Sequence, residues 1–398
     1  MIEGQELGNA RAAILLVTRN LPPLRGGMER LNRHIAIELA SGFRVLVVGP
    51  NGCRAHLPAT VDVHEAPVRP LWRFLARALL LSLSRGKKAR PRIVLAGSGL
   101  TAPIAVITAG IMHARSAVYA HGLDLVTPNL LYRALWLPFL RRCDVCIVNS
   151  RNTARLARQV GIRQERITVI HPGVELPVET GNDGCAAPDF RQRHGLQACK
   201  VMLSVGRLTP RKGIPEFVRQ ALPRIVSACP DVVLVIIGDE APNALQGSGL
   251  GAGERLMECA RELGLERHIR MLGACEDAEL AIAYDVADLC IFPVRALPGD
   301  VEGFGMVAVE AAAHGLPTVA FDVGGVGDAV ADGCSGRLVP AGDYDMFVEQ
   351  VVQTLQIGRT VEVSAACRRF AAGFEWRKFG ARLSDRLRQL VSNDGSLP

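Results

Sequence analysis

Short aliphatic segments alternate with longer amphipathic ones along this chain, and the alternation runs through twice. In the first half, the segments that predict buried strands are 13–18, 44–48, 93–96, 117–120, 145–148 and 167–170. In the second half they are 201–205, 232–237, 269–272, 289–292, 318–321 and 336–339. Strands that alternate with helices are typical of parallel sheets covered on both faces. The sequence therefore predicts an α/β protein with two doubly wound, Rossmann-like parallel-sheet domains facing a central cleft, with ligands at the carboxyl ends of the strands.

A stretch without sustained periodicity separates the two halves. It is rich in Gly, Asn, Asp and Pro, which favour loops. We predict an N-terminal domain over 1–180, a linker over 181–198 and a second domain over 199–375. Residues 376–398 are expected to form a C-terminal helix that packs back toward the N-terminal domain.

The composition argues against several protein classes. With 49% hydrophobic and 21% charged residues, the chain is ordinary for a globular protein with a sizeable core. The longest apolar run, Phe74 to Leu83, is interrupted by Arg77 and is too short to span a bilayer. Residues 1–12 lack the basic-then-apolar pattern of a signal peptide, so none is expected. The 11 cysteines form no spaced framework, which favours reduced thiols and a cytoplasmic protein.

Positive charge is concentrated in the first half of the chain. Residues 1–185 hold 24 Lys and Arg against 12 Asp and Glu, whereas the remainder holds 22 against 27. Such a basic half suits nucleic acid, an anionic membrane or a phosphorylated substrate. The basic residues are not interleaved with the aromatics that stack on single-stranded nucleic acid, so no nucleic-acid partner is expected.

Two segments of the first half combine basic and apolar residues. The stretch from Arg69 to Arg92 carries eight basic residues and no acidic one. As a helix it would align four apolar side chains, Trp72, Leu75, Leu79 and Leu83. Leu130 to Arg142 is a second candidate of the same kind. We expect a peripheral position at the inner face of the cell membrane through Arg69–Arg92, the alternative being ordinary helices that cover the sheet.

Two cations follow the first predicted strand of the second half. Arg207 and Lys212 lie in the segment Ser-Val-Gly-Arg-Leu-Thr-Pro-Arg-Lys-Gly at 204–213, where the chain turns toward a helix. An arginine can fork onto two phosphate oxygens, and a lysine acts as a point charge. The pair suits a diphosphate, although two cations in a solvated loop would give the same pattern.

Two glutamates flank a glycine-rich helix start in the second half. Glu302 precedes a helix that we expect to begin at about Gly305, and Glu310 lies within it. Backbone N–H groups at such a start favour an anionic or hydroxyl-rich ligand, and glycine lets that ligand approach the backbone. The plain structural alternative is a capping glutamate followed by an exposed helical one.

The first half offers weaker candidates. Gly26 and Gly27 occupy the first strand-to-helix turn, where nucleotide phosphates often bind, but they do not belong to a G-x-G-x-x-G fingerprint. His121 follows the strand at 117–120 and would point into the predicted cleft. A flexible turn and a structural histidine are the alternatives.

Two further patterns predict no site. Cys143 and Cys146 have redox or zinc spacing, but no second Cys or His pair of suitable spacing lies near them, so we expect small core residues. The glycine-rich stretch 247–253 lacks the ending of a phosphate loop and predicts a flexible insertion.

Taken together, these segments resemble glycosyltransferase family 4, the retaining nucleotide-sugar transferases of the GT-B fold. Glu302 and Glu310 match the family's E-x7-E motif, and residues 204–213 match its diphosphate segment. Gly26-Gly27, His121 and the His-Pro-Gly-Val segment at 171–174 follow in the expected order. Segments 236–239 and 272–280 also match, so the resemblance covers most of the chain.

The resemblance implies a role for each matching residue. Arg207 and Lys212 would neutralise the donor diphosphate and the charge that grows on it during transfer. Glu302 would hold hydroxyls of the transferred sugar, and His121 would lie beside the anomeric carbon. Glu310 would bind the ribose hydroxyls. The remaining donor-binding positions that the resemblance implies are Gly26, Gly27, Gly238, Asp239, Ala274, Cys275, Gly303, Phe304, Gly305 and Met306.

The function that the resemblance implies is retaining transfer of a hexose, of the mannose or glucose type, from a GDP- or UDP-sugar. The expected acceptor is a lipid-linked or cell-envelope glycan such as lipopolysaccharide. No cofactor or metal is implied, since Arg207 and Lys212 can supply the positive charge. A noncatalytic adaptor and a sugar-nucleotide epimerase of the same fold are the alternatives. Departures from the family pattern at 238–242 and 324–328 leave the donor base and sugar open.

Overall fold

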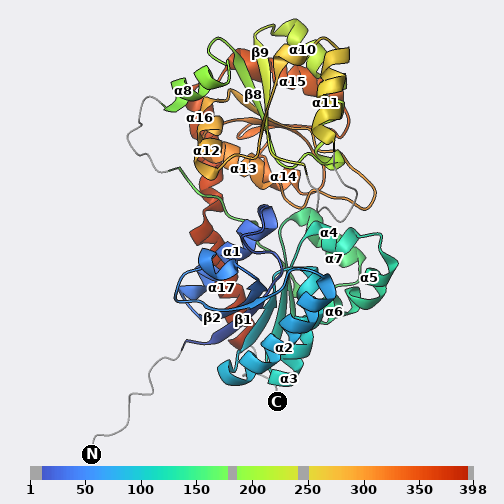
Figure 1. Ribbon diagram of the computed structural model, residues 1–398, viewed down its shortest axis with the longest axis vertical. Coiled ribbons are helices and arrows are strands. Elements are labelled where there is room, and N and C mark those ends of the chain that lie inside the picture. Colours follow the sequence, from blue (N-terminus) through green and yellow to red (C-terminus); the bar gives the residue numbers. More distant parts are fainter. Residues whose placement is uncertain (1–10, 178–185, 241–250, 393–398) are drawn as a thin grey trace, which may run out of the picture. The chain divides into compact units, whose positions relative to one another are not determined.

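The computed structural model describes residues 11–177, 186–240 and 251–392 (Figure 1). The chain divides into two compact units. Unit 1 comprises the residues up to Gly173 together with those from Trp376 onward, and unit 2 comprises Val174–Glu375. Residues 181–185 of the predicted linker and residues 247–250 of the predicted glycine-rich insertion lie outside the described residues.

Unit 1 is built on a seven-stranded parallel sheet with the order β3-β2-β1-β4-β5-β6-β7. The strands are β1 (Ala13–Val17), β2 (Arg44–Pro50), β3 (Asp62–Ala66), β4 (Ile93–Ala96), β5 (Arg115–Ala120), β6 (Val145–Val148) and β7 (Ile167–Val169). Six of them confirm predicted strands. The sequence missed β3 because this strand lies at the edge of the sheet and mixes polar with apolar residues, unlike the continuous apolar runs of the central strands.

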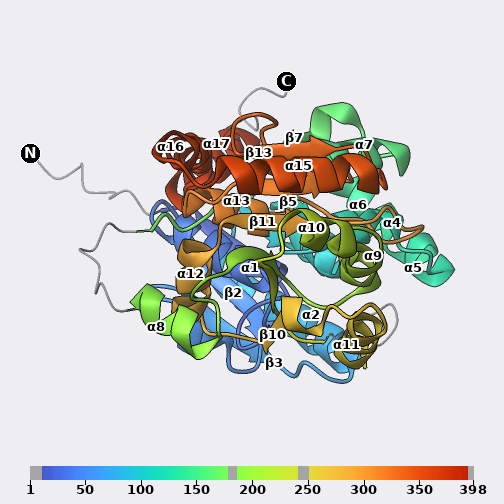
Figure 2. The same ribbon diagram turned by 90° about the horizontal axis from the view of Figure 1, so that it is seen from above.

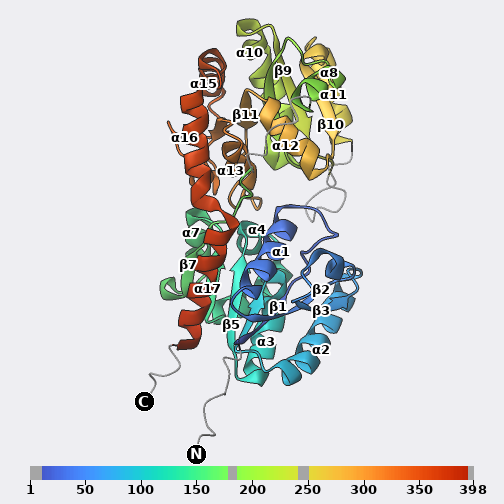
Figure 3. The ribbon, with the colours of Figure 1, turned by 90° about the vertical axis from the view of Figure 1, so that its left-hand side faces the viewer.

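Helices cover both faces of this sheet. They are α1 (Gly27–Ala40), α2 (Leu71–Ala89), α3 (Ala102–Met112), α4 (Gly122–Val126), α5 (Leu130–Leu135), α6 (Leu137–Arg142), α7 (Arg151–Gln159) and α17 (Trp376–Ser392). Helix α17 packs along α1 (Figure 3). The Trp376 ring stacks on His34 at a centroid distance of 3.8 Å. Helix α3 packs against α2 and α6.

The predicted basic helix is α2, but its apolar face is less exposed than expected. Its fully buried side chains, led by Phe74, sit in the core of unit 1. Leu75 and Leu79, predicted on the free face, are partly buried against the same core. Of the four predicted residues Trp72 alone is mostly exposed, at 65%. The prediction placed the apolar stripe correctly on a helix, but the core of unit 1 partly covers Leu75 and Leu79.

Unit 2 is built on a six-stranded parallel sheet with the order β10-β9-β8-β11-β12-β13. The strands are β8 (Lys200–Val205), β9 (Val232–Ile237), β10 (Ile269–Gly273), β11 (Leu289–Phe292), β12 (Thr318–Phe321) and β13 (Gly336–Val339). All six confirm predicted strands. The two doubly wound parallel sheets that the alternation predicts are therefore present.

The helices of unit 2 form a layer on each face of its sheet. They are α8 (Ala186–Arg193), α9 (Ile214–Gln220), α10 (Leu222–Ala228), α11 (Ala252–Glu262), α12 (Asp277–Val286), α13 (Met306–Ala313), α14 (Val326–Ala329), α15 (Tyr344–Ile357) and α16 (Val361–Ala371). Helix α9 lies beside both α10 and α11 (Figure 2). Helices α8 and α12 pack together, as do α13 and α16.

The region predicted as a linker contains helix α8, which belongs to unit 2. Phe190 of α8 is buried in the same core cluster as Leu196, and Arg191 donates to the carbonyl oxygen of Leu196 at 2.9 Å. The prediction of a linker through residue 198 was thus wrong for these residues. A short helix anchored by one aromatic side chain has no repeating apolar pattern, so the sequence pattern did not predict α8.

Within the described ranges, no helix has both the length and the apolar character needed to cross a membrane.

Candidate donor site

A largely buried ion pair lies at the carboxyl-terminal side of β8 and β11 in unit 2. Lys212 lies in a short 3-10 turn that follows β8, and its Nζ is 2.9 Å from Oε2 of Glu302. The ammonium also lies 4.5 Å from the centroid of the Phe292 ring. Burial lowers the pKa of Lys212, and the Glu302 carboxylate opposes that shift. The structure thus brings together two residues that the sequence singled out 90 positions apart.

Arg211 completes this cluster, and sequence reasoning missed it. Its Nη1 lies 3.5 Å from Oε2 of Glu302 and donates to the carbonyl oxygen of Val301 at 2.7 Å. Its Nε lies 3.3 Å from Oδ1 of Asp300. Arg211 therefore fixes the segment that carries Glu302. The sequence could have indicated Arg211, because it directly precedes Lys212 in the segment 204–213.

The cations control the ionisation of Glu302. Burial alone would raise the pKa of this carboxyl group, but Lys212, Arg211 and Arg207 together bring it below its ordinary value. Arg207 is exposed, yet its charge acts on both Lys212 and Glu302. Glu302 is therefore an anion held among three cations, a site where a phosphate could compete for the same partners.

Helix α13 begins where the sequence predicts. Gly305 is its N-cap and has φ of 98°, a conformation that favours glycine. Phe304 is buried in the core, where its ring packs against Phe374. The neighbouring loop is held close, since the N–H of Gly325 donates to the carbonyl oxygen of Glu302 at 2.9 Å.

Glu310 is oriented by a tyrosine that the sequence analysis did not identify. The hydroxyl of Tyr284, from α12, donates to Oε2 of Glu310 at 3.1 Å. Tyr284 is buried, and its ring stacks on His314 of the loop after α13. Tyr284 is the one aromatic residue of α12, and nothing in its spacing connects it to Glu310.

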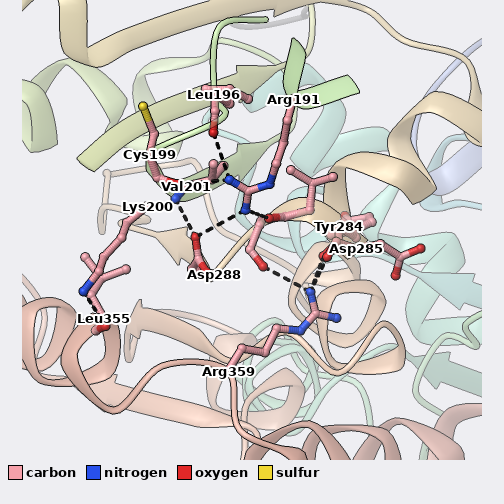
Figure 4. Close-up of polar contacts among 12 residues, drawn as sticks. Arg191, Leu196, Cys199, Lys200, Val201, Tyr284, Asp285, Asp288, Leu355 and Arg359 are labelled. Atoms are coloured by element: carbon pink, nitrogen blue, oxygen red, sulfur yellow. Dashed lines mark hydrogen bonds and ion pairs between the residues drawn. The ribbon is translucent and has the colours of Figure 1, made fainter. Parts of the chain in front are cut away.

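Two arginines fix the end of α12 on which Tyr284 lies (Figure 4). The Nη1 of Arg359 donates to the carbonyl oxygens of Tyr284 at 3.1 Å and Asp285 at 2.7 Å. Arg191 donates to the carbonyl oxygen of Val286 at 2.8 Å. Unpaired carbonyls at a helix end are thereby satisfied, so the helix end and the Tyr284 hydroxyl are held in place.

The positions predicted to lie near the base come together at the ends of β8, β9 and β10. The Oδ1 of Asp239 accepts the N–H of Ala274 at 2.9 Å. Gly238 has φ of 139°, and a β-carbon there would lie 2.2 Å from the carbonyl oxygen of Gly206. Only glycine fits such an approach. Cys275 follows directly and is half-buried; burial and then Glu279 raise the pKa of its thiol.

The candidate residues of unit 1 lie at the carboxyl ends of β1 and β5. Gly26 is the N-cap of α1, which begins at Gly27, and the nearby Glu29 accepts from Nδ2 of Asn20 at 2.8 Å. His121 is buried, and its Nε2 lies 3.2 Å from the carbonyl oxygen of Gly97. The backbone N–H of His121 donates to Oδ2 of Asp124 at 2.9 Å.

The cysteine pair with redox spacing is part of the core. Cys143 and Cys146 are both buried among the apolar side chains of unit 1. Burial raises the pKa of Cys143 to about 12, so it stays a neutral thiol. The prediction of core residues is confirmed. Within the described residues, no group of three or more His, Cys, Asp or Glu gathers in a way that could hold a metal ion.

Two family models match the chain and together span most of it. The model of glycosyl transferases group 1 matches residues 199–356, and the model of glycosyltransferase family 4 matches residues 25–177. A curated relative is the D-inositol 3-phosphate glycosyltransferase of Mycobacterium tuberculosis, with 35% identity over 240 residues. That match covers 58% of this chain and 46% of the relative, so the chain matches less than half of that protein's length.

Solved structures share the fold at low sequence identity. Anabaena Alr3699/HepE in complex with UDP-glucose superposes with a TM-score of 0.76 at 21% identity, over 95% of this chain and 99% of that one. A glycosyltransferase from Rickettsia africae gives a TM-score of 0.80 at 18% identity, over 97% and 100%. WaaG, a glycosyltransferase involved in lipopolysaccharide biosynthesis, gives 0.62 at 17% identity, over 94% and 99%. With both family models matched in order and two parallel-sheet units present, the chain belongs to the glycosyltransferases, with a family 4 domain followed by a group 1 domain.

Proposed function

We propose that this protein transfers a hexose from a nucleoside diphosphate sugar to a glycan or lipid-linked acceptor, with retention of anomeric configuration. The observation that carries the proposal is the buried cluster of Lys212 and Arg211 around Glu302, beside the glycine-capped start of α13. The UDP-glucose complex of HepE supports a nucleotide-sugar donor. A GDP- and a UDP-sugar both fit this proposal, and so do mannose and glucose.

The cluster suggests how donor binding begins. In the free protein the Lys212 ammonium is neutralised by Glu302. A donor diphosphate brings two or more negative charges and can replace the carboxylate as the partner of Lys212, aided by Arg207. Glu302 would then be free to accept hydroxyls of the transferred sugar. Glu310, held by Tyr284, would accept the ribose hydroxyls, and Asp239 with Ala274 and Cys275 would lie near the base.

The transfer step needs charge stabilisation more than proton transfer by the protein. The bond from the anomeric carbon to the phosphate oxygen breaks, and the acceptor oxygen bonds to that carbon on the same face. The acceptor proton passes to the departing phosphate oxygen. Lys212 and Arg207 would stabilise the growing charge on the diphosphate, so a divalent metal would not be required. His121 would lie beside the anomeric carbon, and the Gly26-Gly27 turn would contact the phosphates or the acceptor.

The proposed acceptor is a lipid-linked or cell-envelope glycan, reached by a peripheral position at the cytoplasmic face of the membrane. All eight basic residues from Arg69 to Arg92 are exposed on or beside α2. Each cation near an anionic surface contributes on the order of 1 kcal/mol, so several together would hold the protein reversibly. The relative that acts on an inositol phosphate and WaaG, named for lipopolysaccharide synthesis, are consistent with anionic acceptors.

A donor panel tests the proposal. Purified protein is incubated with UDP-glucose, UDP-galactose and GDP-mannose, and release of nucleoside diphosphate is measured with proton NMR of the sugar product. We expect one donor to be consumed slowly by hydrolysis and to yield the retained anomer first. Binding without consumption would favour a noncatalytic adaptor, and conversion to an epimeric nucleotide sugar would favour an epimerase.

A further inference from the structure

An apolar groove opens on unit 1 between helices α2 and α3. Its volume is about 240 Å³. An apolar cavity of about 150 Å³ is enough to bind benzene, so this groove can take a segment of hydrocarbon chain. The residues that line it are Leu75, Ala76, Leu79, Leu100, Pro103, Ile104, Ile107 and Trp136.

The wall that Trp136 forms is held in place. Its Nε1 donates to the carbonyl oxygen of Leu100 at 2.9 Å. Its ring stacks on Tyr132, with 5.7 Å between the centroids and 9° between the planes. The indole therefore presents its apolar surface to the groove while its polar atom is already satisfied. A polar ligand would find no partner on this wall.

Exposed apolar side chains are concentrated in the part of the chain that forms the groove. Of the fourteen described large hydrophobic residues that are exposed, nine lie between residues 71 and 135, the stretch that includes α2, α3 and α5. They include Trp72 at 65%, Leu80 at 60% and Ile111 at 52% exposure. Apolar side chains concentrated in this way mark an interaction surface, because a soluble monomer gains nothing from them.

The positive charge of this part of unit 1 indicates the kind of partner that the groove would bind. Between Ala66 and Asp144 the sequence has 12 basic residues and a single acidic one, Asp124. Asp124 already accepts the backbone N–H of His121. Arg73 and Arg77 lie one helical turn apart on α2 and flank the groove-lining Ala76 in sequence. A ligand that satisfies both the groove and its cations has a hydrocarbon tail and an anionic headgroup.

We propose that this α2–α3 groove binds one hydrocarbon chain of an anionic membrane lipid, whose headgroup phosphate contacts the basic residues of α2. The inference rests on the proposed function only in that it names the lipid class at the proposed membrane surface. Chain insertion would add a lipid-specific hold to the electrostatic attraction, and would fix α2 relative to the bilayer.

Tryptophan quenching tests chain entry directly. The variant Trp72→Phe leaves Trp136 in the groove wall and Trp376, which is buried against His34. It is mixed with vesicles of phosphatidylglycerol and phosphatidylcholine whose acyl chains are either brominated or plain. We expect brominated chains to reduce the fluorescence relative to plain ones, and a Trp72→Phe/Trp136→Phe variant to lose this difference.

Substitutions in the groove separate chain entry from surface attraction. In the same background, Ala76→Phe fills the groove and Ile107→Gln makes its opposite wall polar, without altering any charge. Leu80→Phe is the matched control, since Leu80 lies on α2 but does not line the groove. We expect both groove variants still to sediment with anionic vesicles, but more weakly than the parent, because the contribution of the inserted chain is lost. Both should lose the quenching, whereas the control should keep the quenching and the binding.

Other results would overturn the inference. They are quenching that persists in both folded groove variants, equal quenching by neutral vesicles, and vesicle binding by the parent without quenching. Binding of an acidic protein in place of lipid would be a further contrary result. Donor binding is followed separately by thermal shift with UDP-glucose and GDP-mannose. A protein that shows quenching but neither binds nor consumes any donor would contradict the proposed function while leaving the lipid site intact.

Discussion

The ammonium of Lys212 lies 2.9 Å from a carboxylate oxygen of Glu302, and the guanidinium of Arg211 reaches the same oxygen at 3.5 Å. Both partners of the closer pair are largely buried, with side-chain exposures of 15% and 13%. In the free protein, the cation proposed to bind phosphate, Lys212, is thus paired with the anion proposed to bind the sugar, Glu302. Ligand binding and stability should therefore respond together when either residue is changed.

Removal of Glu302 is expected to destabilise the free protein. In Glu302→Gln, Lys212 and Arg211 lose a buried counter-charge, which costs about 3 kcal/mol when one partner of a buried pair is deleted. Urea unfolding monitored by circular dichroism measures this cost. The matched control is Lys212→Met/Glu302→Gln, which should recover part of the loss because the unpaired ammonium is gone. A Glu302→Gln variant as stable as the wild type would mean that the ion pair contributes little.

Acid should weaken the same pair. The pKa of Glu302 is lower in the folded protein than its ordinary value, so its contribution is fully present above the ordinary pKa. That contribution is lost as the pH falls from about 4.3, the ordinary glutamate value, through the lower folded value. We expect unfolding free energy to fall more steeply below that pH in the wild type than in Glu302→Gln. Parallel curves for the two proteins would contradict this assignment.

The two candidate diphosphate-binding cations should matter more for rate than for binding. Arg207→Ala and Lys212→Ala are each expected to reduce transition-state stabilisation by roughly 1.5–3 kcal/mol, the scale of a hydrogen bond to a charged group. The value of kcat should fall more than donor affinity does, because leaving-group charge grows as the bond breaks. Steady-state kinetics with and without EDTA measure both effects. Activity that EDTA abolishes and magnesium restores would indicate a metal-dependent transferase instead.

Tyr284 is expected to act through Glu310 as a positioning residue. Tyr284→Phe removes one hydrogen bond to the carboxylate, worth about 1 kcal/mol, and leaves the buried ring in place. Donor KM should therefore rise about fivefold while kcat changes little, since the ribose does not react. Arg224→Ala, which removes an exposed ion pair with Asp345, serves as a distant control. A Tyr284→Phe variant with unchanged KM but reduced kcat would show that Glu310 has another role.

Much of this architecture could be predicted because buried parallel strands consist of continuous aliphatic runs. All twelve predicted strands are present, and the helix start at Gly305 is confirmed. Edge strand β3 escaped because it mixes polar with apolar residues, and α8 escaped because one residue, Phe190, anchors it. In both cases the decisive information is tertiary.

In the candidate site too, local sequence segments predicted some residues, whereas others are identified only by tertiary contacts. Arg207, Lys212, Glu302 and Glu310 could be selected because they stand in conspicuous local segments at strand ends. The link between Tyr284 and Glu310 joins residues 26 positions apart on different helices, and only packing reveals it. The charge balance of Glu302 likewise depends on Arg211, whose contact forms across 91 residues of sequence.

The most direct test of the account is donor turnover by the wild type compared with Glu302→Ala and Glu310→Ala. Each protein is first shown to be folded by circular dichroism, and nucleoside diphosphate release is then followed with the same panel of UDP- and GDP-sugars in the presence of EDTA. We predict that the wild type consumes one donor and that both folded variants lose most or all of this turnover. If both variants turn over the donor at the wild-type rate, the site in unit 2 has been assigned wrongly.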